Sequence, residues 1–337
     1  MPITALRLTP PNSSAIWLAV EPSCHIFFRR SMRSSVQDIL LSSLQTCPAG
    51  NQPIGAFLVN DQSQSWLRNA PGDPVLRGVN WGGLRTLYIK EVRRFFKVQM
   101  QTVWAPAITT LLYLAIFTVA LGRGGRTVDI GTTHVPFANF IGPGLIVMAM
   151  LQNAFANSSF SLLVGKIQGN IVDYLMPPLS TGELIAGLVG ASVTRAVLVG
   201  FAVWLAMLLW PGVSVAIHRP ELVIWFGLMG ALLLSFLGLL TSIWAEKFDH
   251  AAAVSNFVVT PLSLLSGTFY SVHQLAPKFQ AVSHANPFFY VISGFRAGFL
   301  GVSDSPLWVG GLALLGLNLL LWAACYRLLK SGWKIKN

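Results

Sequence analysis

The acidic side chains of this sequence are few, and none lies inside its long apolar runs. Seven of the twelve aspartates and glutamates fall in the apolar part of the chain, between those runs: Asp129, Asp173, Glu183, Glu221, Glu246, Asp249 and Asp304. The sequence has no HExxH motif, no GxSxG turn and no close carboxylate pair suited to acid–base catalysis. It also lacks the GxxxxGK[ST] loop that holds ATP phosphates in many ATPases. The residues therefore predict no enzyme active site, and any ATP hydrolysis would belong to a separate chain.

Cysteine and histidine give no metal site either. Cys24, Cys47 and Cys325 form no CxxC pair and no metal-ligand spacing. His273 and His284 stand near the ends of apolar runs, whereas a proton-coupled transporter normally keeps an ionisable relay group inside the membrane. The sequence thus predicts no metal, no cofactor bound by this chain and no proton relay.

The elements that carry these residues are long apolar helices. The chain is 53% hydrophobic and 10% charged, against roughly 25% charged residues in soluble domains. Each uncharged run is long enough for a helix that crosses about 30 Å of hydrocarbon, where only helices and closed barrels satisfy their backbone groups. Six such runs predict an all-α membrane protein with six transmembrane helices: residues 103–121, 137–165, 196–217, 222–245, 251–277 and 305–326.

Basic residues are distributed unequally between the two sides of this six-span arrangement. One side carries both ends of the membrane domain, with eleven basic residues: Arg85, Lys90, Arg93, Arg94, Lys97, Lys166, Lys247, Arg327, Lys330, Lys334 and Lys336. The other side carries five: Arg123, Arg126, Arg219, Lys278 and Arg296. Since positive loops stay in the cytoplasm, the bias predicts a multi-pass protein with both termini of the membrane domain cytoplasmic.

The first 80 residues differ in kind from the rest. They are rich in Pro, Ser, Gln and Asn, and their apolar runs, such as "AIWLAV" at 15–20, are too short for a signal peptide. A basic stretch, "FFRRSMRSS" at 27–35, suits contact with an anionic membrane surface. We expect residues 1–80 to be a poorly structured extension, either a tail or a misassigned start, and 81–337 to be the membrane domain.

An amphipathic helix is predicted over residues 82–101. Its apolar positions share one face: Leu84, Leu87, Tyr88, Val92, Phe95 and Val98. Its basic positions share the opposite face: Lys90, Arg93, Arg94 and Lys97. The pattern is typical of a helix lying in the membrane interface, with its basic side toward phosphates or a soluble partner. A merely solvated basic flank of the first span is the alternative.

A mixed segment, "VGKIQGNIVDYLMPPLSTGELIAG" at 164–187, joins the second and third spans. Apolar residues Ile167, Ile171 and Leu175 recur at spacing four, between four polar residues: Lys166, Gln168, Asn170 and Asp173. Pro177 and Pro178 end the short helix that this spacing predicts. We expect Thr181 to cap the next helix, with Glu183 in its first turn. Such a segment suits docking of a partner, or it is an ordinary connector.

Five stretches, in order, resemble the bacterial ABC-2 type permeases, in particular the inner-membrane group that includes nodulation-factor export permeases. They are "KEVRRFFKVQMQTVWAPAITTLLYLAIF", "FIGPGLIVMAMLQNAFANSSFS", "KIQGNIVDYLMPPLSTGELIAG", "KFDHAAAVSNFVVTPLSLLSGTFYSV" and "NPFFYVISGFRAGFLG". The resemblance covers residues 81–333 and leaves the first 80 without a counterpart. It implies the fold of type V ABC exporters, with an interfacial helix before the first span.

The resemblance also implies a re-entrant pair of short helices between the fifth and sixth spans. Its residues in this sequence are Asn286, Pro287, Gly294, Arg296 and Gly298. Irregular backbone at membrane depth is tolerated where it packs on protein or faces water. Arg296 is expected either to snorkel outward or to pair in a wet cavity, as an anchor or as part of a path.

The function implied by the resemblance is the membrane subunit of an ATP-driven exporter in the bacterial inner membrane. Two copies of this chain would join two separate ABC ATPase subunits, which would carry the ATP and Mg²⁺, and residues 164–176 would transmit their motion. Polar residues of the second span, among them Gln152, Asn153 and Asn157, either line the path or bond helix to helix. The competing class, a membrane enzyme or scaffold, needs a polar catalytic cluster that these residues do not supply.

Overall fold

The computed structural model describes residues 5–8, 16–19, 79–122, 127–130, 133–210, 213–270, 272 and 275–334. Contacts within the chain divide it into two units, Met1–Leu76 and Arg77–Asn337. In the first unit, strands β1 (Ala5–Leu8) and β2 (Ile16–Ala19) pair antiparallel. The rest of the poorly structured extension predicted over 1–80 lies outside the described residues, apart from residues 79 and 80.

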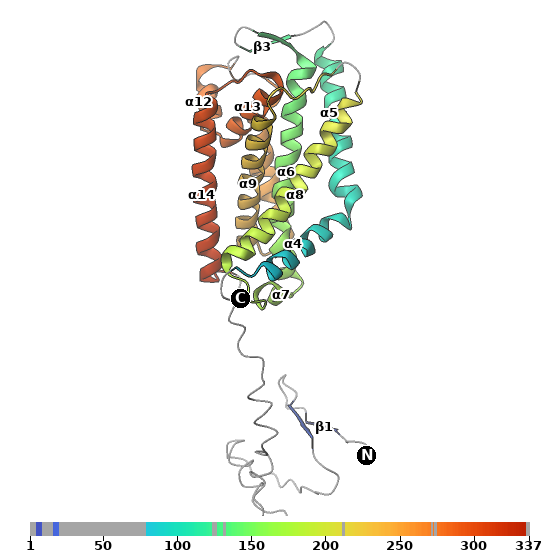
Figure 1. The fold of residues 1–337 in the computed structure, drawn as a ribbon, viewed down its shortest axis with the longest axis vertical. Helices are drawn as coiled ribbons and strands as arrows, with labels where there is room; N and C mark the ends of the chain where they lie inside the picture. Colours follow the sequence, from blue (N-terminus) through green and yellow to red (C-terminus); the bar gives the residue numbers. More distant parts are fainter. Residues whose placement is uncertain are drawn as a thin grey trace, which may run out of the picture. The chain divides into compact units, whose positions relative to one another are not determined.

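The second unit is a bundle of long helices. Among the described residues, five helical segments are long and apolar enough to cross a membrane: Met100–Val119, Phe137–Ile167, Thr181–Leu208, Pro220–Trp244 and Leu307–Ser331. They run side by side along the long axis in Figure 1, as helices α5 (Ala105–Gly122), α6 (Phe137–Ile167), α8 (Thr181–Leu208), α9 (Pro220–Trp244) and α14 (Leu307–Ser331). The π-helical turn η1 (Met100–Trp104) leads directly into α5.

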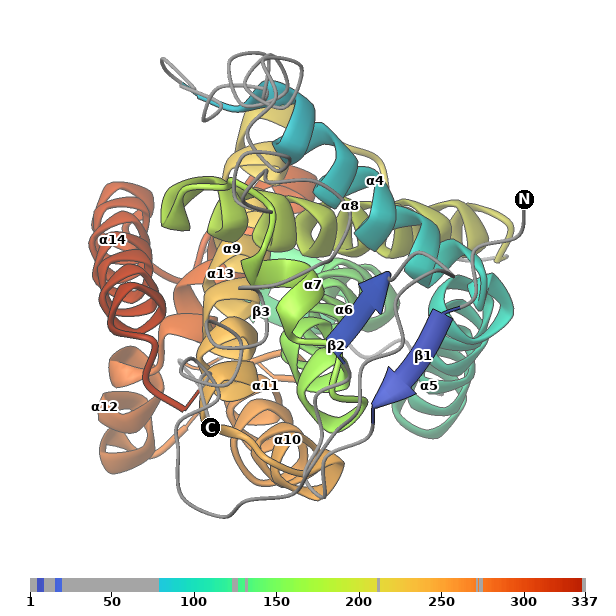
Figure 2. The same cartoon turned by 90° about the horizontal axis from the view of Figure 1, so that it is seen from below.

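Helix α6 lies at the centre of this bundle. It packs most extensively on α9 and α8, and 78% of its most apolar 18 residues are buried. The corresponding fractions are 22% for the first span and 17% for α14, which lie on opposite sides of the bundle in Figure 2. Close packing at the centre depends on small residues. A side chain at Gly238 of α9 would meet the Phe155 carbonyl oxygen of α6 at 2.7 Å.

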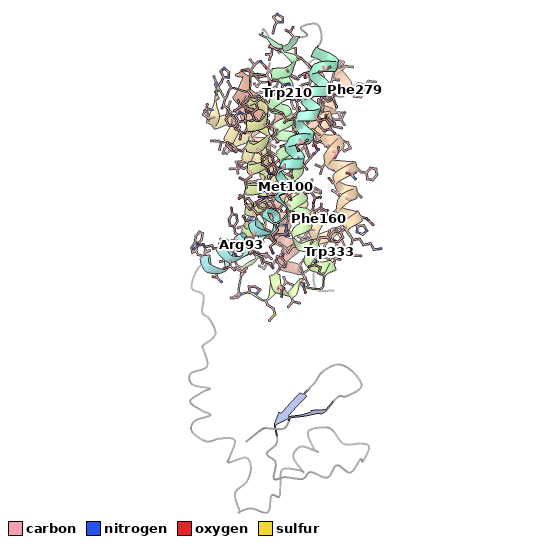
Figure 3. The ribbon with its side chains drawn as sticks, turned by 90° about the vertical axis from the view of Figure 1, so that its right-hand side faces the viewer. Arg93, Met100, Phe160, Trp210, Phe279 and Trp333 are labelled. Carbon is pink, nitrogen blue, oxygen red and sulfur yellow. The ribbon has the colours of Figure 1, made fainter. Side chains whose placement is uncertain are left out.

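Short elements close the two ends of the bundle. Helices α4 (Trp81–Phe96) and α7 (Val172–Leu175) lie at one end, which we call the α4 end (Figure 1). Strands β3 (Thr127–Ile130) and β4 (Thr133–Pro136) form an antiparallel hairpin at the other, the β3 end. Arg93 and Trp333 lie toward the α4 end, and Trp210 and Phe279 toward the β3 end (Figure 3).

The predicted span at 251–277 is a helical run in three pieces rather than one long helix. Helix α10 (Phe248–Val254), the π-helical turn η2 (Ser255–Val259) and α11 (Thr260–Leu265) follow one another without a break. Two further helices follow, α12 (Pro277–Ala285) and α13 (Pro287–Leu300). The six-span count therefore stays a prediction, and the prediction that 251–277 forms one continuous helix is wrong.

The third span was also misplaced along the chain. Helix α8 begins at Thr181, 15 residues before the predicted start at Ala196, and ends at Leu208 rather than at Ile217. Ser180, not Thr181, caps it, in a capping box with Glu183. The helix can begin this early because Arg195, the charge directly before the predicted run, donates to Asn153 of α6 within the bundle.

Candidate functional site

The segment predicted to couple to an ATPase does not form the single short helix expected from its spacing. Helix α6 ends at Ile167, and Gly169 adopts the left-handed conformation (φ 73°) that ends many helices. After this turn α7 comprises only Val172–Leu175. Ile167 and Leu175 thus lie on different helices, and the prediction of one short helix with Ile167, Ile171 and Leu175 at spacing four is wrong.

Apolar side chains are nevertheless exposed at the end of this segment. Val172 is 50% exposed, Leu175 45% and Met176 77%, and Pro177 and Pro178 follow them on the surface. We call these five residues the α7 tip. Ile171, by contrast, is half-buried and packs against the chain's own core. An apolar tip at a helix turn, away from the core, is suited to bind a groove on another protein.

Of the polar residues in the same segment, one is hydrogen-bonded to the bundle and three are exposed to solvent. The Lys166 ammonium group donates to the carbonyl oxygens of Ile243 and Ala245 at the end of α9, where a basic group is favourable. Gln168, Asn170 and Asp173 are exposed. Lys166 therefore ties the start of this segment to the bundle, whereas the polar side chains that follow Lys166 face solvent.

Helix α4 begins with a set of bonds that fixes it to the start of α8. The Asn80 side chain accepts from Gly83 N at 2.9 Å and caps α4, and its amide donates to the Pro178 carbonyl. Glu183 accepts from Asn80 N at 2.6 Å through one oxygen and from Ser180 N at 2.7 Å through the other. One carboxylate thus ties together the first turns of α4 and α8.

The apolar face of α4 packs mainly on α8, where a helix lying on lipid was expected (Figure 2). Leu87 and Phe95 are buried on it, and Leu87 lies against Gly187 of α8. Of the predicted basic face, Arg93, Lys97 and Lys90 are exposed, and Lys90 lies 3.9 Å from the centre of the Tyr174 ring. Arg94 does not belong to this face, because its side chain points inward and is only 30% exposed.

Arg94 instead joins a polar cluster between α4, α6 and α7, which we call the Glu91 cluster. Glu91 is buried and pairs with Arg94 at 2.9 Å, and the Tyr174 hydroxyl donates to its other oxygen at 3.0 Å. Arg94 also donates to the carbonyl oxygen of Asn157 at 3.0 Å. Burial, together with the Glu91 carboxylate, raises the pKa of Tyr174 above its ordinary value, so the hydroxyl remains a donor at neutral pH.

The polar residues of α6 bond helix to helix. The Asn157 amide donates to Ser192 at 3.0 Å, and Arg195 donates to the Asn153 side chain at 2.9 Å, both across to α8. Gln152 is partly exposed and lines a groove of about 300 Å³ between η1–α5 and α6. Of the two predicted roles, Asn153 and Asn157 therefore show helix-to-helix bonding. Asn153 also lines the groove together with Gln152.

The residues expected in a re-entrant element lie on α13 or just before it. Asn286 caps α13 through Phe288 N at 3.0 Å and donates to the Leu262 carbonyl of α11, and Pro287 is the first helical residue. Gly294 lies against the Phe226 ring, and a side chain at Gly298 would meet Val223 at 2.5 Å. These small residues let α13 pack closely along the first half of α9.

Arg296 does not snorkel outward. It is 1% exposed, pairs with Asp304 at 2.9 Å and donates to the Gly267 carbonyl at 2.8 Å. Its guanidinium carbon lies 3.8 Å from the centre of the Phe140 ring of α6. The charge is thus compensated by an ion pair, a backbone bond and an aromatic face inside the bundle.

Sequence reasoning missed four residues of these clusters: Glu91, Tyr174, Arg195 and Asp304. For Glu91 a signal was present, because it lies four residues from both Leu87 and Phe95 on the face that was judged apolar. In the described part of the chain, no three His, Cys, Asp or Glu side chains gather as a possible metal site.

Comparison with known proteins connects this arrangement to transport. A family model described as ABC-2 type transporter matches residues 83–300. The inner membrane transport permease YadH of Escherichia coli (strain K12) is 38% identical over 258 residues, which are 76% of this chain and 98% of YadH.

More distant similarity reaches two nodulation proteins. Nodulation protein J of Neorhizobium galegae is 25% identical over 228 residues, covering 66% of this chain and 85% of that protein. The protein of the same name from Rhizobium leguminosarum bv. viciae is 24% identical over 239 residues, covering 69% and 90%. With the family model matching most of the bundle and YadH aligned over almost its whole length, this chain belongs to the ABC-2 type transporter family of transport permeases.

Proposed function

We propose that this chain is the membrane-spanning subunit of an ATP-driven exporter, in which two copies form the path and two separate ABC ATPase subunits supply the energy. ATP and Mg²⁺ would be bound by the ATPases. The observation that carries the proposal is the α7 tip, an exposed apolar turn held at one end of the bundle. A permease of this family needs a surface through which a soluble motor can move its spans, and the α7 tip has the required exposure and chemistry.

The α4 end is the cytoplasmic end in this proposal, and both termini of the membrane domain lie on that side. Basic residues gather there, on exposed positions of α4 and at the end of α14, as the positive-inside rule requires. Reporter fusions after Gly125 and after Asn337 test the orientation. The fusion at Gly125 should report the outer side and the one at Asn337 the cytoplasm, and two fusions on the same side would refute the topology.

The sixth crossing is assigned to the run from Phe248 to Leu265. Its 18 residues rise about 27 Å at 1.5 Å each, close to the thickness of the hydrocarbon core. Helix α13, with 14 residues, rises only about 21 Å and is too short to cross. Together α12 and α13 would form the re-entrant element, entering from the outer side and turning back at Asn286.

A route from the α7 tip into the spans is supported by the Glu91 cluster. Tyr174, inside α7, donates to Glu91 of α4, and Glu91 pairs with Arg94, which donates to Asn157 of α6. A displacement of α7 by an ATPase would therefore move α4 and α6 with it. The exposed residues of α7 would contact the ATPase, while Tyr174 and Glu91 would transmit the motion.

The decisive experiment places a charge on the α7 tip. Met176→Glu would put a carboxylate into an apolar contact, and burying it without a partner costs several kcal/mol, enough to prevent association. Met176 is a better choice than Ile171, because Ile171 packs on the chain's own core and its substitution would also disturb folding.

The full-length chain is purified from its native membranes in mild detergent, and a copurifying P-loop ATPase is measured by mass spectrometry and by Mg²⁺-dependent ATP hydrolysis. The wild type and Trp333→Glu, an exposed position at the same end of the bundle, should retain the ATPase, whereas Met176→Glu should lose it. Normal complex formation by Met176→Glu would remove the α7 tip from the mechanism, and the exposed basic residues of α4 would become the candidate contact.

A further inference from the structure

Arg195 is a charge in the middle of the membrane-spanning helix α8, and its bond to Asn153 is to a neutral group. It lies 14 residues after the first residue of α8, about 21 Å along the helix, and far from either end. Its guanidinium donates to the Asn153 side chain at 2.9 Å, and its Nε is buried without a hydrogen-bond partner among the described residues. No carboxylate in the described parts of the chain pairs with it. Arginine at such depth normally pairs or marks a functional site.

Arg94 of α4 supplies a second guanidinium, and its partner on α6 lies one helical turn from the partner of Arg195. Arg94 bonds to Asn157 and Arg195 to Asn153, and these two asparagines are four residues apart on the same face, about 6 Å along the helix. Glu91 is the carboxylate that balances Arg94. The pair of arginines therefore leaves one positive charge at this depth without a counter-ion.

A groove of about 300 Å³ between η1–α5 and α6, which we call the α5–α6 groove, is connected to this charge through a shared residue. Asn153, the partner of Arg195, lines it. Its polar lining includes Gln101, Thr109 and Tyr113, which are exposed although they belong to the first span, and Gln152. Polar groups left facing hydrocarbon are costly, so a groove of this kind is expected to hold polar atoms of a ligand.

Apolar side chains make up the rest of the groove. Leu145 and Met148 of α6 and Pro106 of α5 line it, and α5 is exposed along most of its length. An unpaired guanidinium selects phosphate or carboxylate, which it can bind by two parallel hydrogen bonds. The combination of one excess charge, amide groups and an apolar wall fits a molecule with an anionic head and an apolar tail.

We propose that Arg195 and the α5–α6 groove bind the anionic group of an amphiphilic molecule, whose apolar part lies along Leu145 and Met148. This inference rests on the proposed function and names the substrate class of the exporter: lipid-like molecules that carry a phosphate or a carboxylate. Arg195 would contact the anion, and Gln152 and Asn153 would orient it.

The competing explanation is that Arg195 only ties α8 to α6. A neutral amide at position 195 would make the same bond to Asn153 without the cost of a charge at membrane depth. The helix-to-helix bond alone therefore does not account for a charge at position 195, whereas an anionic ligand does.

The test uses the full chain in detergent, with Cys24→Ser and Cys47→Ser to remove the tail thiols and Thr109→Cys as a reporter in the groove; Cys325 is buried. The rate of maleimide labelling is measured with three probes of equal chain length: oleoyl lysophosphatidic acid, oleate and zwitterionic oleoyl lysophosphatidylcholine. The anionic probes should slow labelling, and lysophosphatidylcholine should not. A stronger effect of lysophosphatidic acid than of oleate would indicate a phosphate ligand, and the reverse a carboxylate.

Arg195→Gln should raise the half-protecting concentration of the anionic probes at least about tenfold, the loss expected for one charge-assisted hydrogen bond. Arg195→Lys should have a smaller effect. The matched control, Arg327→Gln, removes an exposed charge from α14 and should change nothing. If Arg195→Gln does not fold, Gln152→Leu serves instead, with an expected loss of about threefold to tenfold.

Equal protection by all three probes, or protection unchanged by Arg195→Gln or Gln152→Leu, would overturn the proposal. The assay contains no ATPase and no transport step. If the anionic probes bind but no ATPase copurifies, the proposed exporter function is refuted and the proposed ligand is not. If an ATPase copurifies but the anionic probes do not bind, only the proposed ligand is refuted.

Discussion

Two arginines pair with buried carboxylates toward opposite ends of the bundle, and the two pairs differ in how far the arginine is exposed. Toward the β3 end, Arg296 and Asp304 are each 2% exposed in their side chains, and a carbonyl oxygen and an aromatic ring complete the surroundings of the arginine. At the α4 end, Glu91 is equally buried, but its partner Arg94 is 30% exposed. The first pair is sealed, and the second is open to water on one side.

The elements that the two pairs connect also differ. Arg296 belongs to α13 and lies against the central helix α6, and Asp304 belongs to the short connection that follows α13. The Glu91 cluster instead joins α4 and α7, which are short and lie at the surface, to the Asn157 carbonyl of α6. A sealed pair resists change because breaking it leaves an uncompensated buried charge. The comparison predicts a rigid α13 region and a movable α4 end.

The largest expected effect is at the sealed pair. Asp304→Ala removes the carboxylate and leaves the Arg296 guanidinium buried without its counter-charge, which should lower the free energy of unfolding by about 3–5 kcal/mol. The measurement is an SDS titration of the purified full chain. The double variant Arg296→Met, Asp304→Leu should lose much less, since it removes both charges. If the double variant were as unstable as the single one, the charge would not be the cause.

The next effect concerns the close packing of the same region. Gly294→Ala would place a methyl group against the ring of Phe226, a buried residue of α9 that faces α13. This overpacking should lower the free energy of unfolding by about 1–3 kcal/mol. The matched control is Gly316→Ala on α14, where nothing lies within 4 Å of the added atom. That substitution should be neutral or slightly stabilising, because alanine favours the helix. Equal losses at both positions would mean that α13 is not tightly packed.

The sequence predicted the family and the all-α class because these depend on apolar run lengths and on motif order. Runs of 18 or more uncharged residues gave four spans within a few residues of the observed helices, including α6 and α9. The third span failed because one charge, Arg195, was treated as a boundary. Whether a charge ends a span depends on its partner, and Asn153 is 42 residues away in the chain.

The clusters could not be predicted for a related reason. Glu91 and Tyr174 are separated by 83 residues, and they meet only because the chain turns after α6 and places Tyr174 within hydrogen-bond distance of α4. Asp304 was assigned to a loop, where an acidic residue is usually solvated, and its burial depends on Arg296 being turned inward. The left-handed Gly169, which breaks the coupling segment, carried a usable signal, since glycine after an apolar helix often ends it.

A smaller effect is expected at the open pair. Tyr174→Phe removes the hydroxyl that donates to Glu91 and leaves one buried carboxylate oxygen without that bond, which should cost about 1–2 kcal/mol. In a double-mutant cycle with Glu91→Gln, the two losses should fall short of additivity by up to about 1 kcal/mol, because Glu91→Gln already replaces the charge-assisted bond that Tyr174→Phe removes with a weaker neutral one. Tyr326→Phe on α14 is the control and should be additive with Glu91→Gln. Additive losses for Tyr174 would indicate that the hydroxyl and the carboxylate are not coupled in solution.

The smallest effect is expected at an exposed pair of the same α4 end, where Lys334 donates to Glu246 at 2.9 Å. This hydrogen bond and the charge of Lys334 hold the pKa of Glu246 below its ordinary value of 4.5. A carboxyl group with a lowered pKa in the folded state stabilises that state above its ordinary pKa, and the contribution disappears as the pH falls through the lower value. The thermal midpoint of Lys334→Gln should therefore lie slightly below that of the wild type at pH 7, and the two should converge in acid and at about 1 M salt, where exposed charges are screened. A difference that persists in acid would show that Lys334 stabilises the α4 end through its packing on Trp333 and not through its charge.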